Sequence, residues 1–495
     1  MLNSKADSRM VIILIIIACL VGFFLRTYFY IINRSLWLDE AMLALNIVNR
    51  SFLDLLKPLD LDQAAPVGFL LLQKVAICLL GVRDYVLRIV PMLSGLLSIP
   101  LMYAVTSQYR QSCVFFSLAL FALSPKLIYY SSELKQYSTD VLASLLLLFI
   151  VPKCIEKNVK PHALIALGIT GVMAMWFSHP SLFVLAGILL TLGLTFATNR
   201  AGYRLMWLIG VGVVCLINLA IIYCVSLRCI ESNSDLLNYH SKSFAPLPWT
   251  NFRWYYDALI GMLSNPATLP TNLITVGLLI IGTFSFAAKK WQLMLVLLAP
   301  LLFTLVTSGL GRYPFTGRFL LFLLPPLLLL LNEGFERFWR ILSKGNRSLS
   351  WLVSVSLIIY FLYGPTATAY KNLQSPPMRE DIKSVMSYMK KHYLKTDVIY
   401  IYYGGGPAFE FYAPLYGFNR DSYTVGSNAR NKPTQYIEDI KKINHSRRVW
   451  FVFSHNCSWC VVNEQDFILE HLNKIGLKKD EHTAEGASAY LYDLR

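Results

Sequence analysis

Charged residues are scarce in this sequence. Asp, Glu, Lys and Arg make up only 15% of the 495 residues, whereas hydrophobic residues make up 55% and aromatic residues 14%. This composition, with a mean hydropathy of +0.49, excludes an intrinsically disordered chain. The net charge of +16 is spread along the sequence and forms no basic stripe of the kind that binds nucleic acid. The composition therefore predicts a membrane protein with no nucleic-acid partner.

A signal-peptide cleavage site is also missing. No small-residue motif follows the first apolar run, which continues past Arg26, so an uncleaved first helix is favoured over a secretory signal. Runs that can cross a hydrocarbon core of about 30 Å recur along the first two thirds of the chain. The eleven predicted spans are 10–32, 86–106, 113–130, 138–152, 162–178, 181–198, 205–227, 272–288, 291–308, 319–335 and 349–365.

The distribution of basic residues favours one orientation of these spans. If the chain starts inside, the internal segments hold many Lys and Arg residues and only three acids, Asp7, Glu156 and Glu336. This arrangement satisfies the positive-inside rule. Counting the shorter apolar stretch 66–80 as a span would put the basic loops outside, so we predict that it lies along the membrane surface. The first external loop is then 33–85.

The sequence after the last predicted span is polar and mixed in character. Its pattern predicts a helix at 378–394, strands at 397–403 and 448–454, and a helix at 463–475. We therefore predict a transmembrane domain at 1–366 and an external soluble α/β domain at 367–495. The glycines at 404–406 follow a strand but lack the spacing of a phosphate-binding loop, which favours a plain turn.

Two of the nine cysteines form a C-x-x-C pattern in the C-terminal domain, Cys457 and Cys460. This pattern is compatible with a structural disulfide or two unreactive thiols, with part of a metal site, or with redox chemistry. A disulfide suits an oxidising outer compartment.

Two acidic motifs lie in the first external loop. Asp39 and Glu40 follow Trp37 near the end of the first span, where mutual repulsion and partial desolvation favour a general base or a cation site. The alternative is a helix N-terminus capped by Asp39. Asp62 and Gln63 precede a proline, a pattern that is also typical of ordinary helix capping.

Two further motifs lie at the predicted outer ends of later spans. Glu133, Lys135 and Tyr137 stand at one such boundary, where a solvated helix edge is the alternative to a binding site. Arg312 and Arg318 lie in an external turn, and the planar guanidinium group suits a phosphate.

All four motifs are predicted on the same side of the membrane. Carboxylates, a lysine and two arginines at a lipid boundary suit a substrate that is part lipid and part phosphate, together with a hydroxyl group to be deprotonated. A transporter more often places its ionisable residues near the membrane midplane. The predicted spans contain no such cluster of charges.

The order of these motifs resembles the GT-C membrane glycosyltransferases over residues 10–335. The branch it resembles is family 39, with the protein mannosyltransferases, the lipid A aminoarabinose transferases and the rhizobial galacturonosyltransferases. The motifs that carry the resemblance are Trp37-Leu38-Asp39-Glu40, Asp62-Gln63-Ala64-Ala65-Pro66, Arg88 with Pro91, Ser124-Pro125, Tyr130 to Tyr137, and Arg312-Tyr313-Pro314 with Arg318.

The resemblance implies an inverting hexosyl- or pentosyltransferase of the cell inner (plasma) membrane. Its donor is expected to be a polyprenyl-phosphate-linked sugar, and its acceptor a hydroxyl group of a lipid, glycan or protein outside the membrane. The resemblance makes Asp39 the general base, with Glu40 and Glu133 as further acids. Asp62 and Gln63 would lie near the acceptor or a metal. A divalent cation such as Mg²⁺ or Mn²⁺, with Asp39 and Glu133 as ligands, is left open.

The resemblance also implies the donor-phosphate residues Lys135, Tyr137, Arg312 and Arg318. This chain departs from the family where it has Ala65-Pro66-Val67 in place of a double proline, and where Lys135 replaces an arginine. Two other functions remain open, namely a transporter or flippase of a lipid-linked glycan, and a non-catalytic assembly protein that acts through its C-terminal domain.

Overall fold

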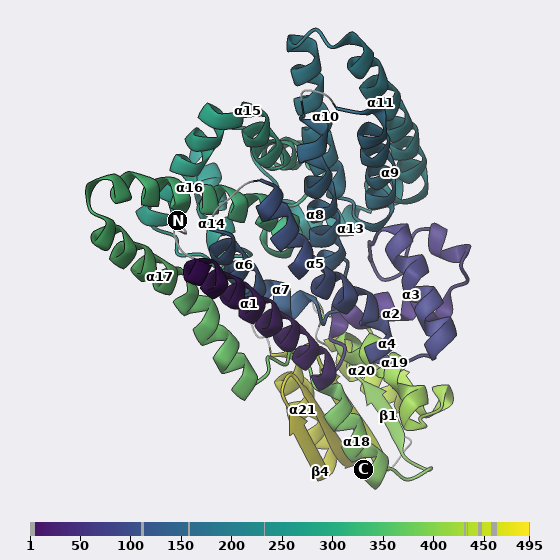
Figure 1. Cartoon of the computed structure of the whole chain (residues 1–495). Helices are drawn as coiled ribbons and strands as arrows, with labels where there is room; N and C mark the ends of the chain where they lie inside the picture. The colour runs from purple at the N-terminus through teal and green to yellow at the C-terminus, as the bar shows by residue number, and fades with distance from the viewer. Residues whose placement is uncertain are drawn as a thin grey trace. The chain divides into compact units, whose positions relative to one another are not determined.

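The computed structural model describes residues 5–494 except 110–112, 157–158, 232, 430–431, 433, 444–447 and 457–462. Cys457 and Cys460 lie outside the described residues. The chain divides into two compact units, which we describe separately (Figure 1). The first unit, here the membrane unit, contains 1–32, 51–81 and 85–375. The second, here the soluble unit, contains 33–50, 82–84 and 376–495.

The membrane unit is helical. Among the described residues, eight helices are long and apolar enough to cross a membrane. They comprise α1 (Lys5–Ile32), α5 (Ile89–Gln108), α8 (Tyr137–Cys154), α10 (Ser181–Thr198), α11 (Gly202–Ile222), α15 (Leu273–Gly309), α16 (Leu324–Gly345), which follows a 3-10 helix at Gly317–Leu323, and α17 (Arg347–Gln374).

Shorter helices complete this unit. They are α3 (Val67–Leu80), α4 (Asp84–Leu87, whose first residue belongs to the soluble unit), α6 (Val114–Leu123), α7 (Pro125–Tyr130), α9 (Pro161–Phe177), α12 (Arg228–Glu231), α13 (Ser234–His240) and α14 (Phe252–Ser264). Helices α9, α10 and α11 pack against one another (Figure 1).

The eight helices that can span a membrane are fewer than the eleven predicted spans, and the difference arises at three places along the chain. The predicted spans 272–288 and 291–308 are both helical, and they are counted together as α15 although the backbone at Lys290 between them is not helical (φ −155°, ψ 86°). The predicted span 113–130 is divided into α6 and α7, and α9 has only 17 residues. Hydropathy finds apolar stretches, but it does not show where a helix continues or breaks.

The division between α6 and α7 satisfies a buried arginine. Pro125 disfavours the helical conformation for Ser124 (φ −57°, ψ 115°), so α6 ends and leaves terminal carbonyl groups available. The guanidinium of Arg26, which is 1% exposed, donates to the carbonyl oxygens of Ala122 at 3.0 Å and Phe121 at 3.3 Å. These bonds hold α1 against the end of α6.

Two glycines allow α15 and α16 to touch through their backbones. A Cβ atom added to Gly282 would lie 2.0 Å from the carbonyl oxygen of Leu330, and one added to Gly334 would lie 1.8 Å from that of Leu278. Such close contact between helices is typical of membrane proteins, where small residues let backbones approach.

The soluble unit is built around a five-stranded sheet with the order β2-β1-β3-β5-β4. Strand β1 (Val398–Ile401) pairs in parallel with β2 (Tyr423–Val425) and β3 (Arg448–Ser454). The hairpin of β4 (Gly476–Ala484) and β5 (Ala487–Leu494) adds to β3 in antiparallel register. The helices of this unit are α2 (Leu38–Asn49), α18 (Ile382–His392), α19 (Gly406–Tyr416), α20 (Thr434–Ile443) and α21 (Glu464–Ile475).

The predicted elements of this domain are confirmed. Helices 378–394 and 463–475 correspond to α18 and α21, and the two predicted strands correspond to β1 and β3. The triple glycine forms a turn into α19, where a Cβ on Gly404 would lie 3.0 Å from the carbonyl oxygen of Ser454. Helix α17 continues through the predicted boundary at 366 to Gln374, and the soluble unit includes α2 from the first external loop.

We predict that Gly334→Ala destabilises the membrane unit, because the added methyl group overlaps a backbone carbonyl and forces α15 and α16 apart. The expected loss is roughly 1–3 kcal/mol, typical of overpacking. The measurement is thermal unfolding of the purified protein in detergent. Gly210→Ala is the matched control, since a Cβ there meets no atom within 4 Å. Equal melting temperatures for the two variants would contradict this account of the helix crossing.

Candidate functional site

Lys135 and Gln63 are joined by a direct hydrogen bond. Lys135 lies in the turn between α7 and α8, where its backbone N–H donates to the carbonyl oxygen of Glu133 at 2.7 Å. Its residue exposure is 4%, and its Nζ donates to Oε1 of Gln63 at 2.7 Å. A buried ammonium group is costly unless it is hydrogen-bonded. The contact therefore couples two motifs that lie far apart in the sequence.

Arg318 and Tyr137 also lie together. The guanidinium carbon of Arg318, on the 3-10 helix before α16, is 5.4 Å from the centroid of the Tyr137 ring. Tyr137 is the first residue of α8, and its ring packs edge-on against the rings of Tyr130 and Phe319. The stacking of a planar cation on an aromatic ring restrains the direction of the guanidinium group.

Arg312 has a different environment from Arg318. Its Nη1 lies 3.0 Å from Oε2 of Glu231, and the hydroxyl of Tyr223 donates to the same carboxylate oxygen at 2.9 Å. Glu231 therefore compensates the charge of Arg312. The two arginines were predicted as a pair, and a role for Arg312 at a phosphate stays a prediction.

Glu133 is completely buried in the turn that also holds Lys135. Glu133 has an exposure of 0%, and Tyr137 of 3%. The alternative of a solvated helix edge is therefore wrong for this motif. Burial of a carboxylate is costly without polar partners, so we infer that contacts within the protein hold the Glu133 side chain in this turn.

Asp62 and Gln63 do not cap the helix that follows them. The N-cap of α3 is Pro66, with no side-chain cap, so the capping alternative is wrong. Asp62 adopts a left-handed conformation (φ 52°), and its Oδ1 accepts a hydrogen bond from Nδ2 of Asn233 at 2.9 Å. Asn233 in turn caps α13 through its Oδ1, which accepts the N–H of Leu236. Gln63 binds Lys135 instead, as described above.

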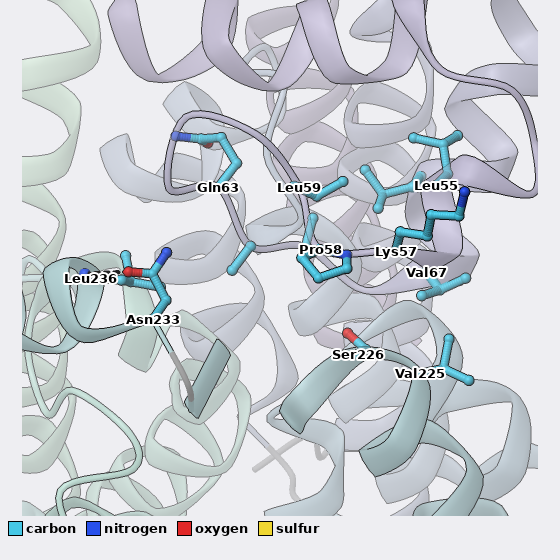
Figure 2. Close-up of a pocket in the computed structure, with 13 residues that line it drawn as sticks. Leu55, Lys57, Pro58, Leu59, Gln63, Val67, Val225, Ser226, Asn233 and Leu236 are labelled. Atoms are coloured by element: carbon cyan, nitrogen blue, oxygen red, sulfur yellow. Dashed lines mark hydrogen bonds between the residues drawn. The ribbon is translucent and has the colours of Figure 1, made fainter. Parts of the chain in front are cut away.

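A small pocket of about 50 Å³ lies beside these contacts (Figure 2). Its polar lining includes Gln63, Asn233 and Ser226, and most of the remaining lining comes from residues 55–70. Lys57 also lines it, but Nζ of Lys57 pairs with Asp54 at 2.7 Å. Hydrogen bonds from Lys57 and then Ser51 lower the pKa of Asp54 to about 2, so Asp54 stays ionised at neutral pH. The net charge of the lining is therefore small.

Asp39 and Glu40 lie in the first turn of α2, in the soluble unit. The N-cap of this helix is Trp37, which makes no side-chain cap, so Asp39 is not the capping residue. Both acids still lie where the helix dipole favours negative charge. Glu40 is buried, at 1% exposure, whereas Asp39 is half-buried. Helix α2 packs against α19 of the same unit.

The two carboxylates named as possible metal ligands belong to different units, Asp39 to the soluble unit and Glu133 to the membrane unit. Within the part of the chain that the structure describes, no three His, Cys, Asp or Glu side chains group closely enough to hold a metal ion. We therefore derive no step through a metal.

Sequence patterns missed several residues of this site. Asn233 and Glu231 lie in a segment without any recognisable motif, and only their contacts with Asp62 and Arg312 identify them. The pairing of Lys135 with Gln63 was not predicted either, although both residues were singled out.

Comparison with known proteins supports the fold directly. No protein-family model and no curated protein matches the sequence. The structure is similar to ArnT from Cupriavidus metallidurans in the apo state, with a TM-score of 0.57, 12% identity and coverage of 98% of both chains. The same protein bound to undecaprenyl phosphate gives a TM-score of 0.58 at 12% identity, again with 98% of both chains covered.

A second similar structure is the oligosaccharyltransferase AglB from Archaeoglobus fulgidus, in complex with an inhibitory peptide and a dolichol-phosphate. It has a TM-score of 0.52 and 12% identity, and the match covers 98% of this chain and 74% of AglB. The chain has the GT-C membrane glycosyltransferase fold. The predicted GT-C fold, a multi-pass helical membrane protein with a C-terminal α/β region, is thus confirmed.

We predict a measurable coupling between Lys135 and Gln63. In a double-mutant cycle with Lys135→Met and Gln63→Ala, the interaction should contribute roughly 1–3 kcal/mol to stability, as expected for a buried hydrogen bond to a charged group. The readout is thermal unfolding in detergent. The exposed pair Lys57–Asp54 is the control and should show little coupling. Additive effects of the Lys135 and Gln63 substitutions would show that the contact does not form.

Proposed function

We propose that this protein is an inverting glycosyltransferase that moves a sugar from a polyprenyl-phosphate donor to a hydroxyl acceptor on the outer face of the membrane. The observation that carries the proposal is the hydrogen bond of the buried Lys135 to Gln63 beside a small polar pocket, in a chain with the GT-C fold. The similar structures bound to undecaprenyl phosphate and to dolichol-phosphate support a polyprenyl-phosphate donor.

The phosphate of the donor requires cations. We assign it to Lys135 and Arg318, whose positions are fixed by Gln63 and by the ring of Tyr137. Fixed cations stabilise the negative charge that develops on a departing phosphate more effectively than mobile ions in water. Arg312, neutralised by Glu231, would add less. Gln63, Asn233 and Ser226, which line the small pocket, offer neutral amide and hydroxyl groups of the kind that hydrogen-bond the hydroxyls of a sugar.

In the proposed reaction, the acceptor oxygen attacks the anomeric carbon from the side opposite the leaving group. The bond between that carbon and the phosphate oxygen breaks, and polyprenyl phosphate leaves with the bonding electron pair. Asp39 takes the acceptor proton as general base, with Glu40 and Glu133 as supporting acids. Because a single displacement from the side opposite the leaving group forms one bond and breaks the other, the configuration of the anomeric carbon is inverted.

We predict that Asp39→Asn abolishes transfer while donor binding persists, because the amide cannot take the acceptor proton. The rate should fall by about 10²–10⁴-fold, typical for loss of a general base. The measurement is transfer of labelled sugar from a panel of polyprenyl-phosphate sugars by the purified protein. The matched control is Asp257→Asn, on an exposed carboxylate of α14. Full transfer by Asp39→Asn would refute the general-base assignment, whereas the absence of transfer by the wild-type protein from every donor would favour a flippase.

We also predict that Lys135→Met weakens binding of undecaprenyl phosphate, because it removes a fixed cation from the phosphate. The dissociation constant should rise about 10- to 100-fold, the equivalent of roughly 1.4–2.8 kcal/mol. Binding of undecaprenyl phosphate is followed by quenching of intrinsic fluorescence. Lys160→Met, at an exposed lysine, is the control. Unchanged affinity in Lys135→Met would remove Lys135 from the phosphate site.

A further inference from the structure

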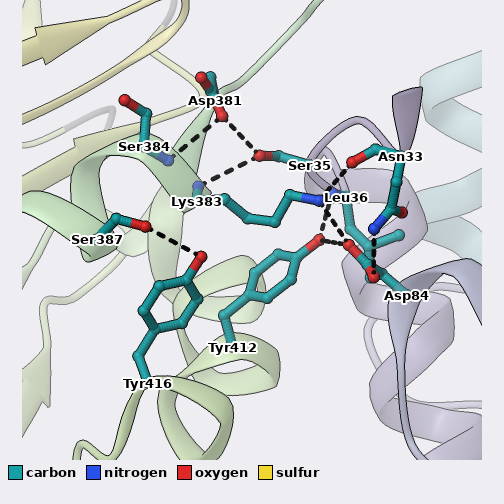
Figure 3. A network of polar contacts seen from close by, with 10 residues as sticks. All are labelled: Asn33, Ser35, Leu36, Asp84, Asp381, Lys383, Ser384, Ser387, Tyr412 and Tyr416. Atoms are coloured by element: carbon teal, nitrogen blue, oxygen red, sulfur yellow. Dashed lines mark hydrogen bonds and ion pairs between the residues drawn. The ribbon is translucent and has the colours of Figure 1, made fainter. Parts of the chain in front are cut away.

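The segment that leads into α2 is held by the C-terminal part of the soluble unit (Figure 3). The hydroxyl of Ser35 donates to Oδ1 of Asp381 at 2.9 Å, and the backbone N–H of Leu36 donates to the hydroxyl oxygen of Tyr412 at 2.9 Å. The Tyr412 hydroxyl donates in turn to Oδ2 of Asp84, also at 2.9 Å.

Lys383 adds a second set of contacts to the same segment. Its Nζ pairs with Oδ2 of Asp84 at 2.8 Å and also donates to the carbonyl oxygen of Asn33. Its backbone N–H donates to the Ser35 hydroxyl at 3.2 Å. The path of the chain from residue 33 to residue 36 is therefore fixed by α18 and α19, on which Lys383 and Tyr412 lie.

Glu380 reaches the first turn of α2 itself. Its Oε2 accepts the backbone N–H of Leu38, the first residue of the helix, at 3.0 Å. This N–H is one of those that a helix cannot satisfy internally. Because Trp37 supplies no side-chain cap, Glu380 contributes one from 342 residues further along the chain. The neighbouring Arg379 stacks over the Trp37 ring, 4.0 Å from its centroid.

The Glu380 carboxylate is itself positioned by the end of β3. Nδ1 of His455 lies 2.7 Å from its Oε1, and the Ser454 hydroxyl donates to its Oε2 at 3.4 Å. Glu380 is 5% exposed. Both carboxylate oxygens therefore have protein partners, and the group that caps α2 is held between the sheet and the helix.

The hairpin between β4 and β5 fixes the backbone of this residue. Gly486, in the turn, has a positive φ of 67°, and a Cβ there would lie 2.0 Å from the carbonyl oxygen of Arg379. The backbone N–H of Asp381 donates to the carbonyl oxygen of Glu485 at 2.7 Å. The β4–β5 turn thus contacts the backbone of both neighbours of Glu380, Arg379 and Asp381, and only a glycine at position 486 leaves room for the contact with Arg379.

We propose that Glu380 is a positioning residue for Asp39, which places the carboxylate of the base by fixing the first turn of α2. The inference rests on the proposed function, in which Asp39 takes the acceptor proton. Asp39 directly follows the residue whose N–H Glu380 binds, so a shift of that turn moves the carboxylate. The C-terminal sheet then acts in catalysis by holding the base, and it need not touch either substrate.

The test compares Glu380→Ala with Glu380→Gln in the full-length protein. Glu380→Ala removes the cap, and kcat should fall about 10- to 100-fold, because a base displaced by about 1 Å can lose two orders of magnitude in rate. The affinity for undecaprenyl phosphate should not change, since Lys135 and Arg318 are untouched. Glu380→Gln retains a carbonyl oxygen for the Leu38 N–H and should recover most of the rate.

The matched control is Asp397→Asn, at the residue just before β1 of the same sheet. Asp397 is 3% exposed and binds Nε of Arg448 at 2.8 Å and Nε1 of Trp450 at 3.1 Å. Neither of these partners lies in α2. This variant should lower the melting temperature of the soluble unit with kcat unchanged. If Glu380→Ala has wild-type kcat, or loses no more rate than Asp397→Asn, the inference is wrong.

Two readouts separate this inference from the proposed function. If Asp39→Asn is inactive and Glu380→Ala is fully active, only the positioning role fails, whereas wild-type protein that transfers no sugar overturns the proposed function itself. Hydrogen exchange requires no activity. Amides in residues 36–44 should exchange faster in Glu380→Ala than in Asp397→Asn, and equal exchange would overturn the role of Glu380 as the cap.

Discussion

The ammonium group of Lys135 is buried in the membrane unit, and it is held there by the side-chain oxygen of Gln63. An apolar bundle can contain such a charge only if a polar group satisfies it, so the position of the 51–66 segment is constrained by this contact. The same segment contains Asp62, which accepts a hydrogen bond from Asn233, and it forms one wall of the pocket. The contacts of Lys135 with Gln63 and of Asn233 with Asp62 therefore help to set the geometry of the candidate site in this unit.

Much of the fold was predictable because hydropathy and strand patterns are local properties of the sequence. Strand β3, helix α21 and the two helical spans that meet near Lys290 match their predicted positions, whereas Pro125 divides the predicted span 113–130. The candidate residues were found one motif at a time. What the sequence did not reveal was pairing, as in the contact of Arg312 with Glu231, because it depends on residues brought together only by folding.

The soluble unit also contains a helix from the N-terminal part of the chain. It includes α2, and with it Asp39, although the sheet of this unit lies more than three hundred residues further along the chain. Sequence reasoning assigned these residues to the first external loop and treated the C-terminal domain separately. The hydrogen bond from Leu38 to Glu380 gives that domain a physical link to the proposed base. If the C-terminal domain did not contact α2, the position of Asp39 would not depend on that domain.

The measurement that tests the central claim most directly uses proteoliposomes containing a labelled polyprenyl-phosphate sugar and a membrane extract as the source of acceptors. The account predicts that the protein releases free polyprenyl phosphate in amounts equal to the sugar that appears on acceptor molecules. Movement of intact donor across the bilayer, with no free polyprenyl phosphate and no labelled acceptor, would contradict it and identify a flippase.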